Sequence, residues 1–506
     1  MRALVWRAGL LAAVAMVPAA PAAADDLRSA LVKAYATNPT LQGARADQRA
    51  TDEEVPIAKA AGRPNISVSN QYVEFLKQSS TSFTAPRRLF GAGADLGVPI
   101  YSGGAVKNQV RAAKTRVEAG QADLRGTEAS VFNQVVAAYM DVIRDQAIVG
   151  LSANNVEVLQ VNLQATSDRF EIGDLTRTDV AQSGSRLALA RGDLQTAQAN
   201  LIASRERYIQ VVGEAPVDLQ PPPPLPGLPA TPADAVAVAL EDNPDLIAAR
   251  ERSKAAGYDI EVAGAGRLPR LSIFTSGDYT NYLGSLGGVG VDANGNPVTV
   301  SVPQISTSAS VGLSATIPIY QGGLPAARER QAQARSAATL ETEIAVERDV
   351  IAQVRSAYSS WQAANAIIAT NQTAVDAAAL SLEGVRAENT VGNRTILNIL
   401  DAEQELLRAQ VQLVTARRNA YVAGFSLLAA MGRGEARDLG LDGGPLYDPD
   451  VNYRRVRNKW NDFAFDRDPV AQSTRTVDTP AQDASIPAGA DVMGPRDEAA
   501  RTPPRP

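Results

Sequence analysis

The chain lacks cysteine and histidine altogether, and only 5% of its 506 residues are aromatic. Without these two residue types it cannot form a disulfide scaffold, a zinc site built on their side chains or a catalytic triad with an imidazole base. No phosphate-binding loop is recognisable either. The net charge of −6 comes without a basic patch, which argues against nucleic acid as a partner. We therefore expect a protein that is not an enzyme and needs no cofactor.

Long apolar runs are missing beyond the N-terminus. Residues 1–24 have the pattern of a secretory signal peptide, with Arg2 and Arg7 before an apolar run from Ala8 to Val17 and small residues at 22–24. No other segment has 18 consecutive apolar residues, so we expect no membrane-spanning helix in the exported chain.

The rest of the sequence contains an internal duplication. A shift of 205 residues aligns Asn38-Pro39 with Asn243-Pro244, and a shift of 219 aligns Pro99-Ile100-Tyr101 with Pro318-Ile319-Tyr320. The second shift also aligns Gly103-Gly104 with Gly322-Gly323, Tyr139 with Tyr358, Gly173 with Gly392 and Thr176 with Thr395. This pattern indicates two copies of one structural unit, joined by a stiff proline-rich linker from Pro221 to Pro232.

Each copy contains a region of strand-like alternation that begins after a proline, Pro64 or Pro269. The clearest run has apolar residues at every second position from Ala309 to Ile319, with small and polar residues between them. Its length suits a tilted strand that crosses a bilayer, and tyrosines such as Tyr101 and Tyr320 would form an interfacial girdle. Alternation alone fits soluble hairpins equally well.

A long helix is expected after each glycine pair, because apolar residues recur every seven positions. The first series includes Val135, Val142 and Val149 after a single step of four, and the second copy repeats this step between Val350 and Val354. Each helix should cover about 65 residues, or roughly 100 Å, and be followed by a shorter antiparallel return helix. The glycine pairs would allow the backbone to bend between strand and helix.

These patterns divide the chain into consecutive segments. We expect a signal peptide (1–24), first waist helices (25–63), a first β-hairpin (64–102), a first long helical hairpin (103–212), a linker with second waist helices (213–268), a second β-hairpin (269–321), a second long helical hairpin (322–432), a waist-docking C-terminal segment (433–468) and a disordered tail (469–506). Within the second β-hairpin, the glycine-rich stretch from Gly284 to Pro303 should be an exposed loop.

Four strands per chain cannot close a membrane barrel, because lipid does not tolerate open sheet edges and the smallest single-chain barrels have about eight strands. Two copies would give a barrel filled by side chains, whereas three would leave a solvated lumen, and we prefer three. The predicted fold is therefore mixed α and membrane β. It is a trimeric 12-stranded β-barrel, with four strands per chain, continuous with a 12-helix periplasmic α-barrel of antiparallel coiled-coil hairpins.

The two predicted hairpin turns carry a family resemblance that extends to nearly the whole exported chain. Phe170-Glu-Ile-Gly173-Asp-Leu-Thr-Arg-Thr-Asp179-Val and Thr390-Val-Gly392-Asn-Arg394-Thr-Ile-Leu-Asn398-Ile-Leu-Asp401 resemble the helix-turn tips of the TolC outer-membrane channel family. The resemblance implies a homotrimer in outer-membrane lipid, an inner-membrane ABC or proton-driven transporter, and a periplasmic adaptor. The adaptor would dock on Gly173, Asp174, Leu175, Thr176, Gly392, Asn393, Thr395 and Ile396.

The resemblance also implies a periplasmic gate. Arg394 matches a tip arginine that holds the family's closed state, Asp179 matches an aspartate linked to it, and Thr178 lies beside Asp179. Asp401 matches an acidic ring position that faces the lumen. Asn398 and Asn389 depart from the pattern, because the family's best-studied member has an aspartate and a tyrosine there. Without a gate, Arg394 and Asp179 would be a surface ion pair worth at most about 1 kcal/mol.

The resemblance favours an exit duct that conducts substrate passively. The tail with Tyr453, Arg457 and Trp460 resembles that of family members in type I protein secretion, and small-molecule efflux by the same kind of duct is the alternative. A secreted coiled-coil filament with soluble strands would also explain the sevenfold repeat and the signal peptide. It would not explain why the alternation recurs between proline and paired glycine in both halves.

Overall fold

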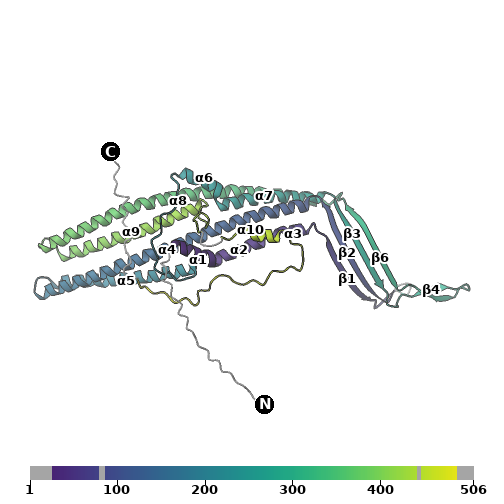
Figure 1. Cartoon of the computed structure of the whole chain (residues 1–506), viewed down its shortest axis with the longest axis horizontal. Helices are drawn as coiled ribbons and strands as arrows, with labels where there is room; N and C mark the ends of the chain where they lie inside the picture. The colour runs from purple at the N-terminus through teal and green to yellow at the C-terminus, as the bar shows by residue number, and fades with distance from the viewer. Residues whose placement is uncertain (1–25, 79–85, 442–445, 487–506) are drawn as a thin grey trace, which may run out of the picture.

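The computed structural model describes residues 26–78, 86–441 and 446–486 of the chain. The molecule is long and narrow, with helices over most of its length and a β-sheet at one end (Figure 1). The predicted signal peptide lies outside the described residues. Within the described ranges, no helix combines the length and the apolar character needed to span a bilayer.

Two helices of 67 residues each, α4 (Ala105–Glu171) and α8 (Leu324–Thr390), run along the molecule. Each is followed by an antiparallel return helix, α5 (Arg177–Val212) or α9 (Ile396–Ala430), as the sevenfold repeat predicted. The two turns between them lie at the same end of the molecule, opposite the sheet (Figure 1). Apolar side chains at the repeat positions pack between the helices of each pair, for example Val375 against Leu413.

Glycines at the junctions have the backbone conformation that the sequence predicted. Gly103 and Gly104 precede α4 with φ of 65° and 84°, and Gly322 and Gly323 precede α8 with φ of 61° and 83°. A side chain would strain the backbone in this left-handed region, so the glycine pairs allow the turn from sheet into helix.

Shorter helices surround the middle of the long ones. The first copy contributes α1 (Leu27–Thr37), α2 (Pro39–Asp52) and α3 (Glu54–Ala60), and the second contributes α6 (Pro232–Asp242) and α7 (Pro244–Gly264), which a 3₁₀ turn (Ala265–Arg267) follows. The helix α7 packs against both α4 and α8. The largest core cluster forms where α1, α4, α5 and α9 meet, around Phe132, Tyr139, Tyr208 and Phe425.

The two Asn-Pro breaks do more than end a helix. The Asn38 side-chain oxygen accepts hydrogen bonds from the N–H groups of Thr40 and Leu41, while its amide nitrogen donates to the carbonyl of Val211 at 2.9 Å. Asn243 caps α7 in the same way and donates to Ala430 at 2.9 Å. Each buried asparagine therefore ties a waist helix to the end of a return helix.

The proline-rich linker is fastened to the helices by tyrosine hydroxyls. Tyr139 donates to the carbonyl of Gln220 at 2.6 Å, and its duplicate Tyr358 donates to Ala230 at 2.7 Å. Tyr421 donates to Pro223 at 3.2 Å, and burial raises the pKa of this tyrosine to about 12. The linker is therefore held in place at both ends, consistent with the stiffness expected from its prolines.

The sheet contains β1 (Asn65–Glu74), β2 (Arg88–Ser102), β3 (Arg270–Asn281) and β6 (Ile305–Thr316), in the order β1-β2-β3-β6 with all neighbours antiparallel. Pairing of β2 with β3 joins the two copies. The last strand ends at Thr316, earlier than the alternation to Ile319 suggested, because Thr316 lies opposite Arg270, where its partner strand β3 begins.

The exposed loop 284–303 contains a small hairpin of its own, β4 (Gly288–Val291) and β5 (Pro297–Val300), which the sequence analysis did not anticipate. Its turn is built on Asp292, whose carboxylate accepts hydrogen bonds from the N–H groups of Asn294 and Asn296.

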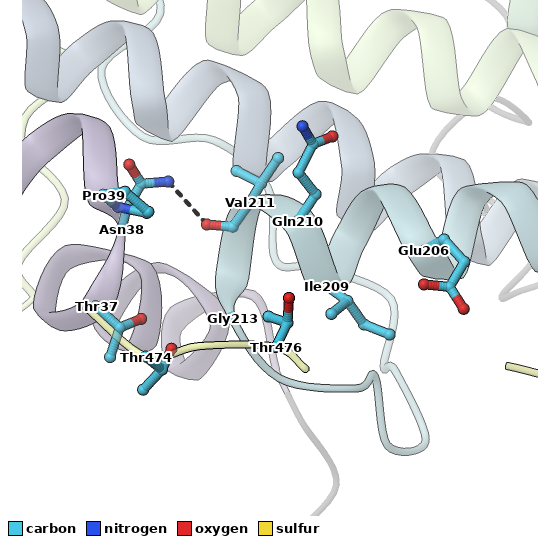
Figure 2. Close-up of a pocket in the computed structure, with 10 residues that line it drawn as sticks. All are labelled: Thr37, Asn38, Pro39, Glu206, Ile209, Gln210, Val211, Gly213, Thr474 and Thr476. Carbon is cyan, nitrogen blue, oxygen red and sulfur yellow. Dashed lines mark hydrogen bonds between the residues drawn. The ribbon is translucent and has the colours of Figure 1, made fainter. Parts of the chain in front are cut away.

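The C-terminal part includes a helix and a segment without regular structure that contacts the helices at a few points. The helix α10 (Pro449–Val456) packs on α2, and farther along the chain Ala484 and Ile486 pack against the largest core cluster. The Arg205 side chain, only 10% exposed, donates to the carbonyls of Asp483 at 2.6 Å and Ser485 at 2.7 Å. Thr474 and Thr476 line a pocket together with residues 37–39 and the end of α5 (Figure 2). Backbone carbonyls can thus dock a polar segment, while residues 487–506 lie outside the described part.

Candidate functional site

One face of the sheet is apolar across all four strands. The register places Ile66 opposite Leu96, and Ile273 opposite both Val98 and Leu313. Within one chain this face is open, since Ile66 is 74% exposed and Val311 is 77% exposed. The face also includes Val68, Ala94, Leu271, Ala309 and Ala315. A continuous exposed apolar face of this kind suits contact with lipid.

A β-bulge adds an aromatic residue to the apolar face. The pairing of β2 with β3 slips between Pro99 and Tyr101, so that Tyr101 lies opposite Leu271. The extra residue, Ile100, has no partner in this register, and the shift turns the tyrosine to the apolar side. Tyr101 thus lies at the helix-proximal end of the sheet, where an interfacial aromatic girdle was expected.

The opposite face of the sheet is small and polar. Ser276 and Ser310 are hydrogen-bonded across strands at 2.7 Å, and Ser308 donates to Asp278 at 3.3 Å. Phe274 lies on this face over Gly312, where a Cβ atom would come within 2.6 Å of its ring. The two outermost strands, β1 and β6, each pair on one side only in the described chain. A sheet with one apolar face, one polar face and two unpaired edges has the features of one segment of a barrel wall.

The turn between α4 and α5, which we call the first tip, is a compact capped structure. Gly173 has φ of 84°, and the Asp174 N–H donates to the carbonyl of Arg169 at 2.9 Å. Thr176 and Asp179 form a reciprocal capping box at the start of α5. Hydrogen bonds from the side chain and backbone of Thr176 lower the pKa of the Asp179 carboxyl. Thr178 is exposed and Leu175 is half-buried.

The turn between α8 and α9, the second tip, repeats this backbone. Gly392 has φ of 82°, and the Asn393 N–H donates to Glu388 at 3.0 Å. Asn398 accepts hydrogen bonds from the N–H of Thr395 at 3.1 Å and from its hydroxyl at 2.8 Å, the role that Asp179 plays in the first tip. The next residue after the cap, Ile396, is half-buried.

The charges at the two tips are arranged differently. In the first tip Arg169 pairs with Asp174 at 2.7 Å, whereas in the second Arg394 pairs with Glu388 at 2.6 Å. Asn389 donates to the carbonyl of Arg394 at 2.7 Å. In the described chain the partner of Arg394 is thus Glu388 and that of Asp179 is Thr176. The contact between Arg394 and Asp179 expected from the resemblance stays a prediction.

Near the tips, polar side chains link the first helical hairpin to the second. Arg186 of α5 pairs with Asp401 of α9 at 2.6 Å and also donates to Gln404. The Glu403 side chain, 5% exposed, accepts a hydrogen bond from Arg386 at 3.0 Å. The side-chain amide of Asn162 donates to both oxygens of the same carboxylate.

Sequence reasoning singled out Asp401 but missed its partner and Glu403. Glu403 could have been noticed, because it lies four residues after Ile399 and three before Leu406 on the apolar stripe of α9. A charged residue at such a position usually needs a partner.

The fold and the two-faced sheet define the class of protein as an outer-membrane channel. A family model described as Outer membrane efflux protein matches residues 30–214 and 235–433, close to the two halves of the duplication. The chain belongs to this family. It is an outer-membrane protein that extends into the periplasm, and it is not an enzyme, which confirms the family resemblance of the sequence.

Similar proteins agree with this assignment. Outer membrane efflux protein BepC of Brucella suis biovar 1 (strain 1330) is 35% identical over 440 residues, which cover 87% of this chain and 92% of BepC. Outer membrane protein TolC of Escherichia coli (strain K12) is 26% identical over 436 residues, covering 82% and 84% of the two chains. Among solved structures, the Campylobacter jejuni CmeC outer membrane channel has a TM-score of 0.70 at 16% identity and covers 85% of this chain and 89% of its own.

Proposed function

We propose that three copies of this chain form a duct that carries substrate passively across the periplasm and the outer membrane. The observation that supports it best is the four-stranded sheet, apolar on one face, polar on the other and open at both edges. Three such sheets joined at their edges satisfy every backbone donor and acceptor within the membrane and leave a solvated lumen.

The duct needs partners at its periplasmic end. We place the adaptor on the two tips, around Gly173 to Thr176 and Gly392 to Ile396, because these turns are the end of the molecule farthest from the sheet (Figure 1). An inner-membrane transporter, either an ABC or a proton-driven one, supplies the energy. The chain itself makes and breaks no bond.

The gate is placed in the tips and the polar contacts just behind them. Arg394 and Asp179 hold the closed state, Asp401 faces the lumen, and a partner splays the tips apart. Three copies of Asp401 around a narrow axis would attract cations and repel anions once their pairing with Arg186 is broken. Arg394→Ala and Asp179→Ala should raise single-channel conductance in planar bilayers, and unchanged conductance would refute this latch.

The proposed cargo is protein, through a type I secretion system. Alkaline protease secretion protein AprF of Pseudomonas aeruginosa is 28% identical over 318 residues, 61% of this chain, which supports this assignment. Small-molecule efflux is the second candidate, because BepC is named an efflux protein. Deletion of the gene, followed by comparison of the secreted proteome and of drug susceptibility, separates the two. Loss of secreted proteins alone supports the first, and increased drug sensitivity alone supports the second.

A further inference from the structure

Three large aromatic side chains stand exposed on one short loop after α10. In residues 457–466, which we call the aromatic loop, Trp460 is 79% exposed and both Phe463 and Phe465 are 83% exposed. Aromatic residues are scarce in this chain. Exposure of three of them to water on one loop does not stabilise the folded chain. The exposure indicates that something apolar covers the loop in the assembled protein.

The loop has a fixed shape. The Arg455 guanidinium binds both oxygens of Asp466, each at 2.8 Å, and Lys459 lies 3.2 Å from the same carboxylate. Hydrogen bonds from these two cations lower the pKa of Asp466 to about 2, so this clamp is intact at physiological pH. Between the clamped ends, Asn461 forms a turn by accepting from the N–H groups of Phe463 and Ala464. The aromatic side chains are thus presented by a closed loop.

The aromatic loop is attached at the foot of the sheet. Arg63 donates to the carbonyl of Lys459 at 2.6 Å, and Lys59 donates to the carbonyl of Arg457 at 2.7 Å. Strand β1 begins at Asn65, two residues after Arg63. Figure 1 shows α10 beside α3, at the end of the helical region that faces the sheet. Trp460, the residue after Lys459, therefore lies near the level at which the apolar face begins.

The surroundings of the loop are rich in positive charge. Burial lowers the pKa of Lys59, and the neighbouring cations Lys114, Arg63 and Arg457 lower it further. Arg467 adds another cation beyond the clamp, while Asp462, Asp468 and the clamped Asp466 are the nearby acids in sequence. Cations next to exposed tryptophan and phenylalanine are the combination that binds the interface of an anionic membrane.

We propose that the aromatic loop is a lipid anchor, which inserts Trp460, Phe463 and Phe465 into the periplasmic leaflet of the outer membrane beside the barrel and prefers anionic phospholipid. Three factors favour lipid over a second copy of the chain. The loop is attached where the lipid-facing strands start, its cations complement anionic headgroups, and the attachment is at the same end of the sheet as Tyr101. The proposal rests on the barrel position of the strands.

Tryptophan fluorescence can test the anchor in the full trimer reconstituted in vesicles. The chain has three tryptophans, so Trp6→Phe with Trp361→Phe leaves Trp460 as the only reporter. Brominated phospholipid should quench this emission about twofold, because the proposal places Trp460 at the membrane interface, within contact range of bromine on the acyl chains. In a Trp460→Phe variant, Trp361 reports from the helical region beside Tyr358 and should not respond.

A second reporter separates failure of the anchor from failure of the barrel. Val311→Trp, in a chain without other tryptophans, should be quenched like Trp460 because it lies on the apolar sheet face. Quenching of Val311→Trp without quenching of Trp460 overturns the anchor and leaves the barrel intact. If the emission of Trp460 is in that case shifted to the blue, a second copy of the chain covers it. An unshifted emission means that Trp460 is exposed to water. Quenching of neither reporter overturns the barrel position of the strands.

The preference of the aromatic loop for anionic phospholipid is tested by a comparison of two brominated lipids. At equal mole fraction, brominated phosphatidylglycerol should quench Trp460 more than brominated phosphatidylcholine, whereas Val311→Trp should respond equally to both. Arg467→Gln should reduce the difference for Trp460, and it leaves the Asp466 clamp untouched. Equal quenching of Trp460 by the two lipids overturns the anionic preference.

Discussion

Arg186 of α5 and Asp401 of α9 form an ion pair of 2.6 Å that joins the first helical hairpin to the second near the tips. The Arg186 side chain is 30% exposed and that of Asp401 is 55% exposed, so the pair contributes at most about 1 kcal/mol to stability. In the proposed gate its position would give it more influence on gating than on folding, because the two hairpins would have to separate there for the tips to splay.

Removal of this pair should favour the open state. We expect Arg186→Ala to raise single-channel conductance or open probability in planar bilayers, with little change in the thermal stability of the trimer. Arg191→Ala, on the exposed surface of the same helix, is the matched control. If both variants conduct like the parent chain, Arg186 does not restrain the tips.

The asparagine bridges at the waist should contribute measurable stability. Asn38→Ala removes both a helix cap and the hydrogen bond to Val211, and should lower the free energy of unfolding by about 1–2 kcal/mol. Asn38→Asp keeps the cap acceptor but places a carboxylate against the Val211 carbonyl. Heat denaturation in detergent would measure the change in the free energy of unfolding for both variants. A neutral Asn38→Ala variant would show that the bridge is dispensable.

Stability should depend on pH through Glu128, which accepts a hydrogen bond from the Ala436 N–H at 2.7 Å. Burial raises the pKa of this carboxyl above its usual 4.5, and the nearby charge of Glu435 raises it further. The folded state therefore favours the protonated acid. Its stabilising contribution is complete below the unfolded pKa of 4.5 and is lost as pH rises through the folded pKa.

Glu128→Gln keeps a hydrogen-bond acceptor and removes the titration. The fall in thermal midpoint above pH 4.5 should become shallower in this variant, and its midpoint at neutral pH should be at least that of the parent chain. A parallel pH profile for parent and variant would mean that another group causes the dependence.

The C-terminal segment should be released by a single substitution. Arg205→Ala removes the guanidinium that holds the carbonyls of Asp483 and Ser485. We expect proteases to cleave residues 474–486 about tenfold faster in this variant, since cleavage follows the population of the undocked segment. Arg207→Ala on the exposed side of α5 is the control. Equal cleavage rates would show that the Arg205 contacts do not hold the segment.

Much of the architecture follows from the sequence because it depends on local pattern. The step from Val350 to Val354 within the sevens, the glycine pairs and the alternation around Val311 each specify a period or a backbone conformation. The duplication then fixes the order of elements without knowledge of their contacts.

The contacts between elements could not be predicted in this way. A period shows which side of α9 is buried, but not that Arg186 of another helix lies opposite Asp401. The bulge at Ile100 depends on the register between β2 and β3, which are far apart in sequence. The docking of residues 469–486 depends on backbone carbonyls, which every sequence has and composition does not reveal.

The two tips have one backbone shape and two charge arrangements. A binding protein that follows the course of the main chain meets the same target twice on every subunit. A binding protein that recognises charge contacts a cation, Arg169, before Gly173 in the first tip. At the equivalent position of the second tip it contacts an anion, Glu388. A ring of identical binding partners could therefore bind both tips through shape, yet distinguish neighbouring positions around the ring through electrostatics.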